Sequence, residues 1–217
     1  MSPTDEQRER VLSYYGGVTR WMRPAVESLV DDADAVIARA REIFGGMLDD
    51  MPYIDRPMHT MAGSMFSCGA MLAIHLVVRE RGVDAHAWGR AIHALPVVLP
   101  EGTDEDRERG RADAQESQAA GEGEFVFEML DAADGIDRGM NITSCAICHL
   151  FGKHDAMELV PYMCSFDDVV SDSRGDGLRR TGSIALGADR CDFRYKTGGD
   201  PLALASQYPE RIRLNDE

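Results

Sequence analysis

The spacing of apolar residues changes near residue 124, and this change is the feature that most constrains the fold. Before it, large apolar side chains recur at steps of three and four residues, which places them on one face of a helix. After it, two short apolar runs, 124–131 and 136–143, flank Asp134 and Gly135. An Asp-Gly pair is a strong signal for a tight turn between two strands. The sequence therefore predicts an α+β fold, in which a helical N-terminal layer packs on a small antiparallel sheet with one or two helices.

Three helices are predicted in the first half of the chain. The first begins near Pro24, which suits a first turn, and stops at Gly45 and Gly46. The second is predicted over residues 60–81, and the third over 84–95, where Asp84 is the N-cap and a proline follows.

Residues 101–123 are nearly devoid of large apolar side chains. This composition indicates either a solvated helix or a mobile loop, and we interpret it as an acidic surface connector. Further on, helical spacing is predicted over 144–170, with an interruption at Pro161, and a second strand pair over 178–185 and 191–196.

We interpret the whole chain, residues 1–217, as a single domain. Its parts are a helical layer (1–100), the connector (101–123) and an α+β part that carries the Cys and Asp motifs (124–200).

The charge balance excludes several classes of function. The chain has 23 basic and 38 acidic residues, a net charge of −15, so we expect no binding to nucleic acid or to anionic membranes. It has no unbroken run of 18 apolar residues, and its first residues are polar and acidic, so neither a membrane helix nor a signal peptide is predicted. We expect a cytoplasmic protein. Its methionine- and aromatic-rich helical layer could form the face of a homodimer.

The five cysteines are expected to be free thiols in a cytoplasmic chain. Cys145, Cys148 and His149 spell the attachment motif of c-type haem. Haem attachment would require export, and a zinc site would require a second ligand pair at similar spacing, which the sequence lacks. A redox dithiol would sit at the start of a helix that follows a strand, and the predicted elements place the pair there. No cofactor or bound metal is expected.

Single thiols from three elements form a different hypothesis. Cys145 is predicted where a strand meets a helix, a position at which backbone N–H groups lower the pKa of a thiol. Asp167 follows Cys164 by three residues and therefore lies on the same helix face. Cys191 and Asp192 lie at the edge of the last strand. These groups could converge on one pocket, but each cysteine taken alone could equally be a small buried hydrophobic residue.

Residues 141–196 carry three ordered sequence blocks that resemble the L-2-amino-thiazoline-4-carboxylic acid hydrolase family. The blocks are Cys145 after a strand with ELVPYMCSFD (158–167), RTGS (180–183), and GADRCDFR (187–194). The resemblance implies a hydrolase that opens a small cyclic amidine, an aminothiazoline ring, at a C–N or C–S bond toward an N-carbamoyl cysteine.

The resemblance also implies site residues. The candidate reacting residues are Cys145, Cys164, Asp167, Cys191 and Asp192. The candidate substrate-binding residues are Arg180, as a two-point clamp for a carboxylate, with Thr181 and Asn141.

His59, at the start of the second predicted helix, could be a general base from the helical layer or an ordinary capping or surface histidine. Two other functions stay open at this point. One is a zinc-dependent hydrolase that uses the same Cys/Asp cluster, and the other is a non-catalytic protein that binds a small molecule.

Overall fold

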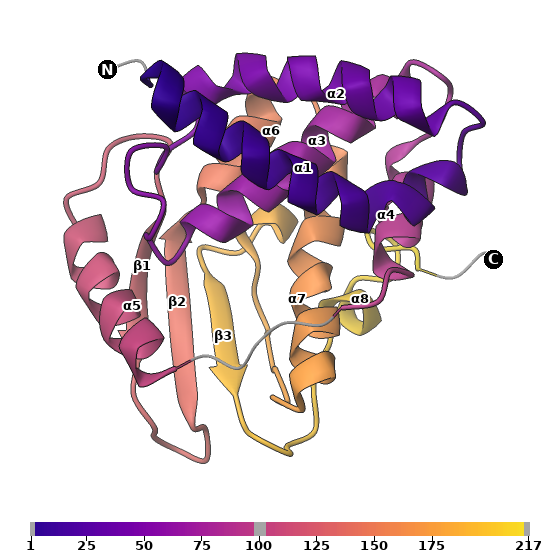
Figure 1. The fold of residues 1–217 in the computed structure, drawn as a ribbon. Helices are drawn as coiled ribbons and strands as arrows, with labels where there is room; N and C mark the ends of the chain where they lie inside the picture. The colour runs from indigo at the N-terminus through magenta and orange to yellow at the C-terminus, as the bar shows by residue number, and fades with distance from the viewer. Residues whose placement is uncertain (1–2, 98–102, 215–217) are drawn as a thin grey trace.

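The computed structural model describes residues 3–97 and 103–214. Four helices form the N-terminal layer, which lies across the top of the molecule in Figure 1. They are α1 (Asp5–Glu27), α2 (Ala33–Met47), α3 (Ala62–Arg79) and α4 (Ala85–His93), with a short 3-10 turn at Leu48–Asp50.

Below this layer, three antiparallel strands form a sheet in the order β1-β2-β3. The strands are β1 (Val126–Leu130), β2 (Arg138–Ser144) and β3 (Cys191–Tyr195). The helices of this half are α5 (Asp104–Ser117) beside β1, α6 (Ala146–Lys153) after β2, α7 (Val160–Arg174) next to β3, and the short α8 (Leu204–Gln207). The predicted α+β class is confirmed.

The predicted Asp-Gly turn joins β1 to β2. Asp134 and Gly135 both have positive φ, 50° and 82°, as a type I′ hairpin turn requires. The register pairs Ile142 with Cys191 on β3 and with Phe127 on β1, so these three side chains share the face of the sheet that packs in the core.

The prediction of one helix from Pro24 to Gly45 is wrong. Thr4 forms a capping box with Gln7 and starts α1 twenty residues earlier than predicted, and Pro24 lies inside its last turns. Gly45 and its neighbour lie inside α2, which continues to Met47. Neither glycine has a positive φ, so neither acts as a helix stop.

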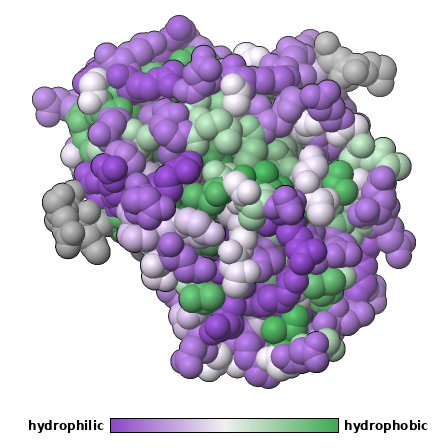
Figure 2. Space-filling model, turned by 180° about the vertical axis from the view of Figure 1, so that it is seen from behind, coloured by the Kyte–Doolittle hydropathy of each residue, from purple (hydrophilic) through white to green (hydrophobic). Residues whose placement is uncertain are grey.

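The second and third predicted helices are confirmed as α3 and α4. Asp84 is the N-cap of α4, where its side chain accepts a hydrogen bond from Ala87 N at 2.8 Å. By length and composition α3 could cross a membrane, but 67% of it is buried inside the fold, as expected for a core helix. The face in Figure 2 is mainly hydrophilic, with smaller hydrophobic areas between polar residues.

The acidic segment 101–123 is more than a surface connector. Its described part forms α5, which covers β1, and the buried Ser117 hydroxyl both donates to Phe127 O and accepts from Phe127 N, each at 3.1 Å. Small residues on one face, Gly110 and Ala114 among them, allow this close contact in a segment with few large apolar groups.

The prediction of a strand over 178–185 is wrong, although the segment does run beside β3. Arg179 forms isolated bridges with Arg194 and with Leu202. The ladder stops there because the Asp192 side chain accepts the backbone N–H groups of Thr181 and Gly182, at 2.9 and 2.6 Å. The chain then turns into a short 3-10 helix, Ile184–Leu186.

The contact between α4 and α7 gives a test of the fold. A Cβ at Gly89 would overlap the buried ring of Tyr162, so Gly89→Ala is expected to lower the free energy of unfolding by about 1–3 kcal/mol. Gly46→Ala is the control, since a Cβ there meets nothing within 4 Å and alanine favours helix by about 0.5–1 kcal/mol. Urea denaturation of both variants measures this, and equal stability would contradict the packing described here.

Candidate active site

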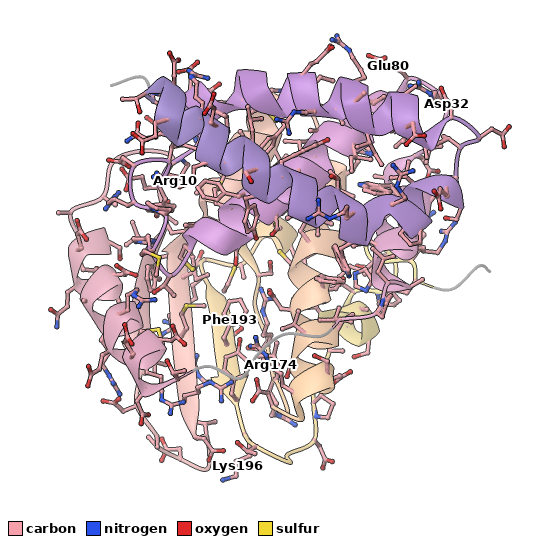
Figure 3. All side chains as sticks on the ribbon, in the orientation of Figure 1. Arg10, Asp32, Glu80, Arg174, Phe193 and Lys196 are labelled. Carbon is pink, nitrogen blue, oxygen red and sulfur yellow. The ribbon has the colours of Figure 1, made fainter. Side chains whose placement is uncertain are left out.

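Arg180 lies at the centre of the site, between β3 and α7. Its Nη1 donates to Asp167 Oδ2 and to the backbone oxygen of Cys164, both at 2.9 Å. Its guanidinium carbon lies 4.0 Å from the centre of the Phe193 ring, and Figure 3 shows Phe193 in the space between β3 and α7. The Arg180 side chain is 1% exposed. The arginine therefore joins the segment beside the sheet to one face of α7.

Asp167 combines two properties that rarely occur together. Burial is the largest cause of its raised pKa, which the charge of Arg180 partly offsets. Yet 45% of its side chain is accessible to solvent. Together these observations describe a carboxylate that protein surrounds on most sides and that water still reaches. Arg180 binds it from the buried side.

Two thiols flank the ion pair and meet at Ser183. The Ser183 hydroxyl donates to Cys164 Sγ at 3.4 Å, and Cys191 Sγ lies 3.9 Å from the same hydroxyl oxygen. Cys191 Sγ also accepts from Ile184 N at 3.3 Å. Ser183 is fully buried, so these contacts fix both sulfur atoms relative to the backbone of the 178–186 segment.

Two more cysteines lie close enough to interact electrostatically with this group. Burial is the main cause of the raised pKa of Cys164, of Cys191 and of Cys68, and the neighbouring Cys145 sulfur adds to it. Asp167 also raises the pKa of Cys68, which comes from α3 in the helical layer. These residues together form what we call the Asp167 site: Asp167, Arg180, Ser183, Cys68, Cys145, Cys164 and Cys191.

The sequence did not single out Cys68. It lies among apolar residues in a core helix, and its only signal was that it is the fifth cysteine of a chain whose other four cluster. The structure places Asp167, Cys164 and Cys191 around Arg180 and Ser183, and Cys145 nearby.

The thiols of the site are protonated at neutral pH. Burial raises the pKa of Cys164 to about 12 and also raises that of Cys191. The expectation of a lowered pKa at Cys145 is wrong: the amides of Ile147 and Cys148 do lower it, but the thiol of Cys148 and burial raise it further.

Asp192 and Thr181 lie beside the Asp167 site, and their hydrogen bonds hold the backbone of the neighbouring segment in place. The Asp192 carboxylate accepts from the Thr181 hydroxyl at 2.5 Å as well as from two backbone amides. Asp192 and Cys191 are neighbours in β3, so their side chains point to opposite faces of the sheet. Asp192 therefore shapes the segment that carries Arg180 and Ser183, from the other side.

Asn141 also lies on the face away from the cysteines, since it pairs with Asp192. Its Nδ2 donates to Glu128 Oε1 at 2.6 Å and its Oδ1 accepts from Arg194 at 2.8 Å. The same Arg194 lines a hollow of about 580 Å³ at the β1–β2 turn. The structure thus places Asn141 in a cross-strand polar network and not with the Asp167 site.

His59 lines a different pocket, of about 220 Å³, between α5 and the segment after α2. Its ring stacks on Tyr53 with centroids 3.9 Å apart, and Nδ1 accepts from Met61 N at 3.1 Å. Burial lowers its pKa. The other residues of this pocket include Arg56, Glu116 and Glu124, and none is a cysteine.

A metal centre finds no support in the geometry. Within residues 3–97 and 103–214, no three His, Cys, Asp or Glu side chains are arranged to hold a metal ion. In the described part of the chain, Cys145, Cys164, Cys191 and Asp167 are therefore not arranged as the ligand set that the zinc hypothesis requires.

The neighbouring Asp168 gives a pH-dependent prediction. Burial raises its pKa to about 7, its Oδ2 accepts from Leu204 N at 2.9 Å, and its buried Oδ1 has no partner. A carboxyl whose pKa is higher in the folded state destabilises the fold as pH rises from its unfolded pKa toward 7. Asp168→Asn is therefore expected to stabilise the protein by about 1–3 kcal/mol at pH 8 and little at pH 4. Urea denaturation at both values tests this, and an equal gain at both would exclude the charge as its cause.

One comparison with known proteins gives a match. Residues 99–195 match the family model of L-2-amino-thiazoline-4-carboxylic acid hydrolase. No curated protein and no solved structure matches the chain. The matched range includes every residue of the Asp167 site except Cys68. The match covers a little under half of the chain and supports a hydrolase.

Proposed function

We propose that this chain, whose residues 99–195 match the family model of L-2-amino-thiazoline-4-carboxylic acid hydrolase, opens a small thiazoline-like ring at the Asp167 site. The observation that carries the proposal is the Asp167 carboxylate, which Arg180 holds in place while 45% of its side chain stays accessible. A fixed, accessible carboxylate is what a hydrolase needs to activate a water molecule.

The proposed reaction adds one water to the C=N carbon of a cyclic amidine. Asp167 takes a proton from the water as its oxygen bonds to this carbon, and passes that proton to the ring nitrogen. The tetrahedral carbon then expels its ring heteroatom as C=O forms, so that a C–S or C–N bond breaks, and Asp167 transfers the hydroxyl proton to the leaving atom. The product is the substrate plus one water, and Asp167 returns to its starting state.

Water is a better nucleophile here than a cysteine. A thiol whose pKa is about 12, as at Cys164, is protonated at neutral pH and attacks poorly. The carboxyl of Asp167 is a stronger base than an exposed aspartate, because burial raises its pKa. In this mechanism the neutral thiols form a polarizable wall that suits a sulfur-containing ring.

Arg180 acts in this mechanism mainly on Asp167. Its Nη1 already binds the Asp167 carboxylate and the Cys164 carbonyl, while its buried Nε has no partner. Binding of a substrate carboxylate would have to use the remaining edge of the guanidinium. Arg180 thus keeps Asp167 charged and oriented, and a clamp role would be additional.

The test is incubation of the purified protein with L-2-amino-thiazoline-4-carboxylate, with and without a chelator, followed by mass spectrometry. A product heavier by one water, formed equally with chelator, supports the proposal. Activity lost to the chelator would favour the zinc-dependent alternative. Substrate that is bound tightly and recovered intact would favour a binding protein instead.

A cytoplasmic location and a homodimer through the helical layer are part of the same proposal. Five free cysteines suit a reducing compartment. Sedimentation of the purified protein measures the oligomeric state, and a monomer at micromolar concentration would contradict the dimer.

A further inference from the structure

The proposed reaction gives no part to Cys148, which lies outside the Asp167 site. Cys148 is the third residue of α6 after its N-cap Cys145, and side chains three positions apart lie on the same side of a helix. The thiol of Cys148 also raises the pKa of Cys145. Both residues are partly exposed, and both are free thiols in this structure.

The backbone at Cys145 allows the two sulfur atoms to approach further. Cβ atoms three residues apart on a helix are about 5–6 Å from each other, whereas a disulfide needs about 3.5–4.5 Å. Cys145 is outside the helix proper, with extended φ and ψ of −118° and 108°. Rotation at this residue can close the gap without breaking α6, whose first helical bond runs from His149 N to Cys145 O.

We propose that Cys145 and Cys148 form a reversible disulfide that switches off the Asp167 site. The oxidant is a low-molecular-weight disulfide such as oxidised glutathione. The Cys148 sulfur attacks it and releases one small thiol, and the Cys145 sulfur then displaces the second. Two protein thiols become one disulfide, and one small disulfide becomes two small thiols, so electrons and protons balance.

The other cysteines are less suited to pairing. Cys164 and Cys191 are held through Ser183 and the Ile184 amide, and they belong to separate elements, α7 and β3. Cys68 belongs to α3 in the other layer. A disulfide between any two of Cys68, Cys164 and Cys191 would require whole helices or strands to move, because a disulfide bond has a narrowly defined geometry.

Closure of the disulfide would affect the proposed hydrolysis, and this part of the inference rests on the proposed function. Cys145 contributes to the electrostatic surroundings of Cys68, Cys164 and Cys191. A bond between Cys145 and Cys148 fixes the Cys145 sulfur and removes its free thiol from the surroundings of Cys164 and Cys191. Oxidation is therefore expected to abolish most of the activity, and dithiothreitol to restore it.

The disulfide can be tested by tryptic digestion, because trypsin cleaves after arginine and lysine and so separates the cysteines into different peptides. Trypsin releases residues 139–153 as a peptide that contains Cys145 and Cys148 and no other cysteine, while the remaining three cysteines fall in separate peptides. The folded protein is equilibrated in mixtures of reduced and oxidised glutathione, alkylated, digested and weighed. The expected result is a 139–153 peptide two hydrogens lighter and without alkyl groups, while the Cys164 and Cys191 peptides remain alkylated.

Two variants control the experiment. Cys148→Ser is expected to keep the basal activity, to lose the mass change and to make activity insensitive to oxidised glutathione. Cys68→Ser is expected to form the disulfide as the wild type does. A 139–153 peptide with two alkylated cysteines in fully oxidising buffer, or with stable glutathione adducts, would overturn the proposal.

These experiments distinguish failure of the disulfide proposal from failure of the hydrolase proposal. If no form of the protein hydrolyses the thiazoline, the mass measurement still tests the disulfide. If the disulfide forms and activity is unchanged, the switch is overturned while the proposed hydrolase stands.

Discussion

Replacing Arg180 with methionine is expected to lower the free energy of unfolding by about 2–4 kcal/mol and to remove hydrolysis. Methionine keeps most of the side-chain volume, so the effect reports the lost charge and hydrogen bonds and not a cavity. Breaking a buried ion pair by removing one partner typically costs about 3–5 kcal/mol. We expect a smaller loss because 45% of the Asp167 side chain is accessible, so water can solvate the carboxylate that remains.

Arg179→Met is the matched control. Arg179 is the preceding residue on the same segment, is exposed, and donates to Asp200 O at 3.3 Å. An exposed substitution of this kind changes stability by about 0.5 kcal/mol or less. Urea denaturation with comparison of midpoints and slopes separates the two variants. A similar loss in both would mean that the segment, and not the Arg180–Asp167 pair, is what the substitutions disturb.

Asp167→Asn is expected to reduce kcat/KM by about 10²–10⁴-fold with little change in the fold, because the amide cannot accept a proton from water. The asparagine oxygen can still accept the hydrogen bond from Arg180 Nη1. Asp172→Asn, an exposed position on the same helix, is the control and is expected to keep full activity. Retained turnover in Asp167→Asn would exclude Asp167 as the base.

The same mechanism predicts the acid limb of the activity profile. Hydrolysis requires the ionised carboxylate, so activity should rise with pH through the pKa of Asp167. Burial raises this pKa, so the rise should come at a higher pH than for an ordinary aspartate. A profile that is flat from pH 4 upward would contradict this assignment.

Local sequence signals predicted a large part of the fold. The β1–β2 turn was predictable because Asp134 and Gly135 both adopt positive φ, which few other residue pairs tolerate. The start of α4 was predictable because Asp84 is a capping residue with an amide to bind. The start of α1 lies at the capping box of Thr4 and Gln7, well before the apolar stripe from which the first helix is predicted.

The site was predictable only in part, because its members come from distant elements. Cys164 and Asp167 lie three residues apart on one helix, so helical spacing predicted their common face. The approach of Cys68 depends on how α3 packs over the sheet, and no local signal reports that. Whether a pKa is raised or lowered also depends on tertiary packing. At Cys145 the Cys148 thiol and burial raise the pKa by more than the amides at the start of α6 lower it.

The segment 178–186 beside β3 also protects the edge of the sheet against pairing with a strand of another molecule. An unpaired strand edge offers rows of N–H and C=O groups to which another chain can add, and this is a common route to aggregation. Here one side of the segment pairs with β3 through Arg179, and its other side pairs with Leu202. The Asp192 carboxylate takes the next two amides. A change at Asp192 would leave these two amides without their acceptor, at a place where another chain could then add.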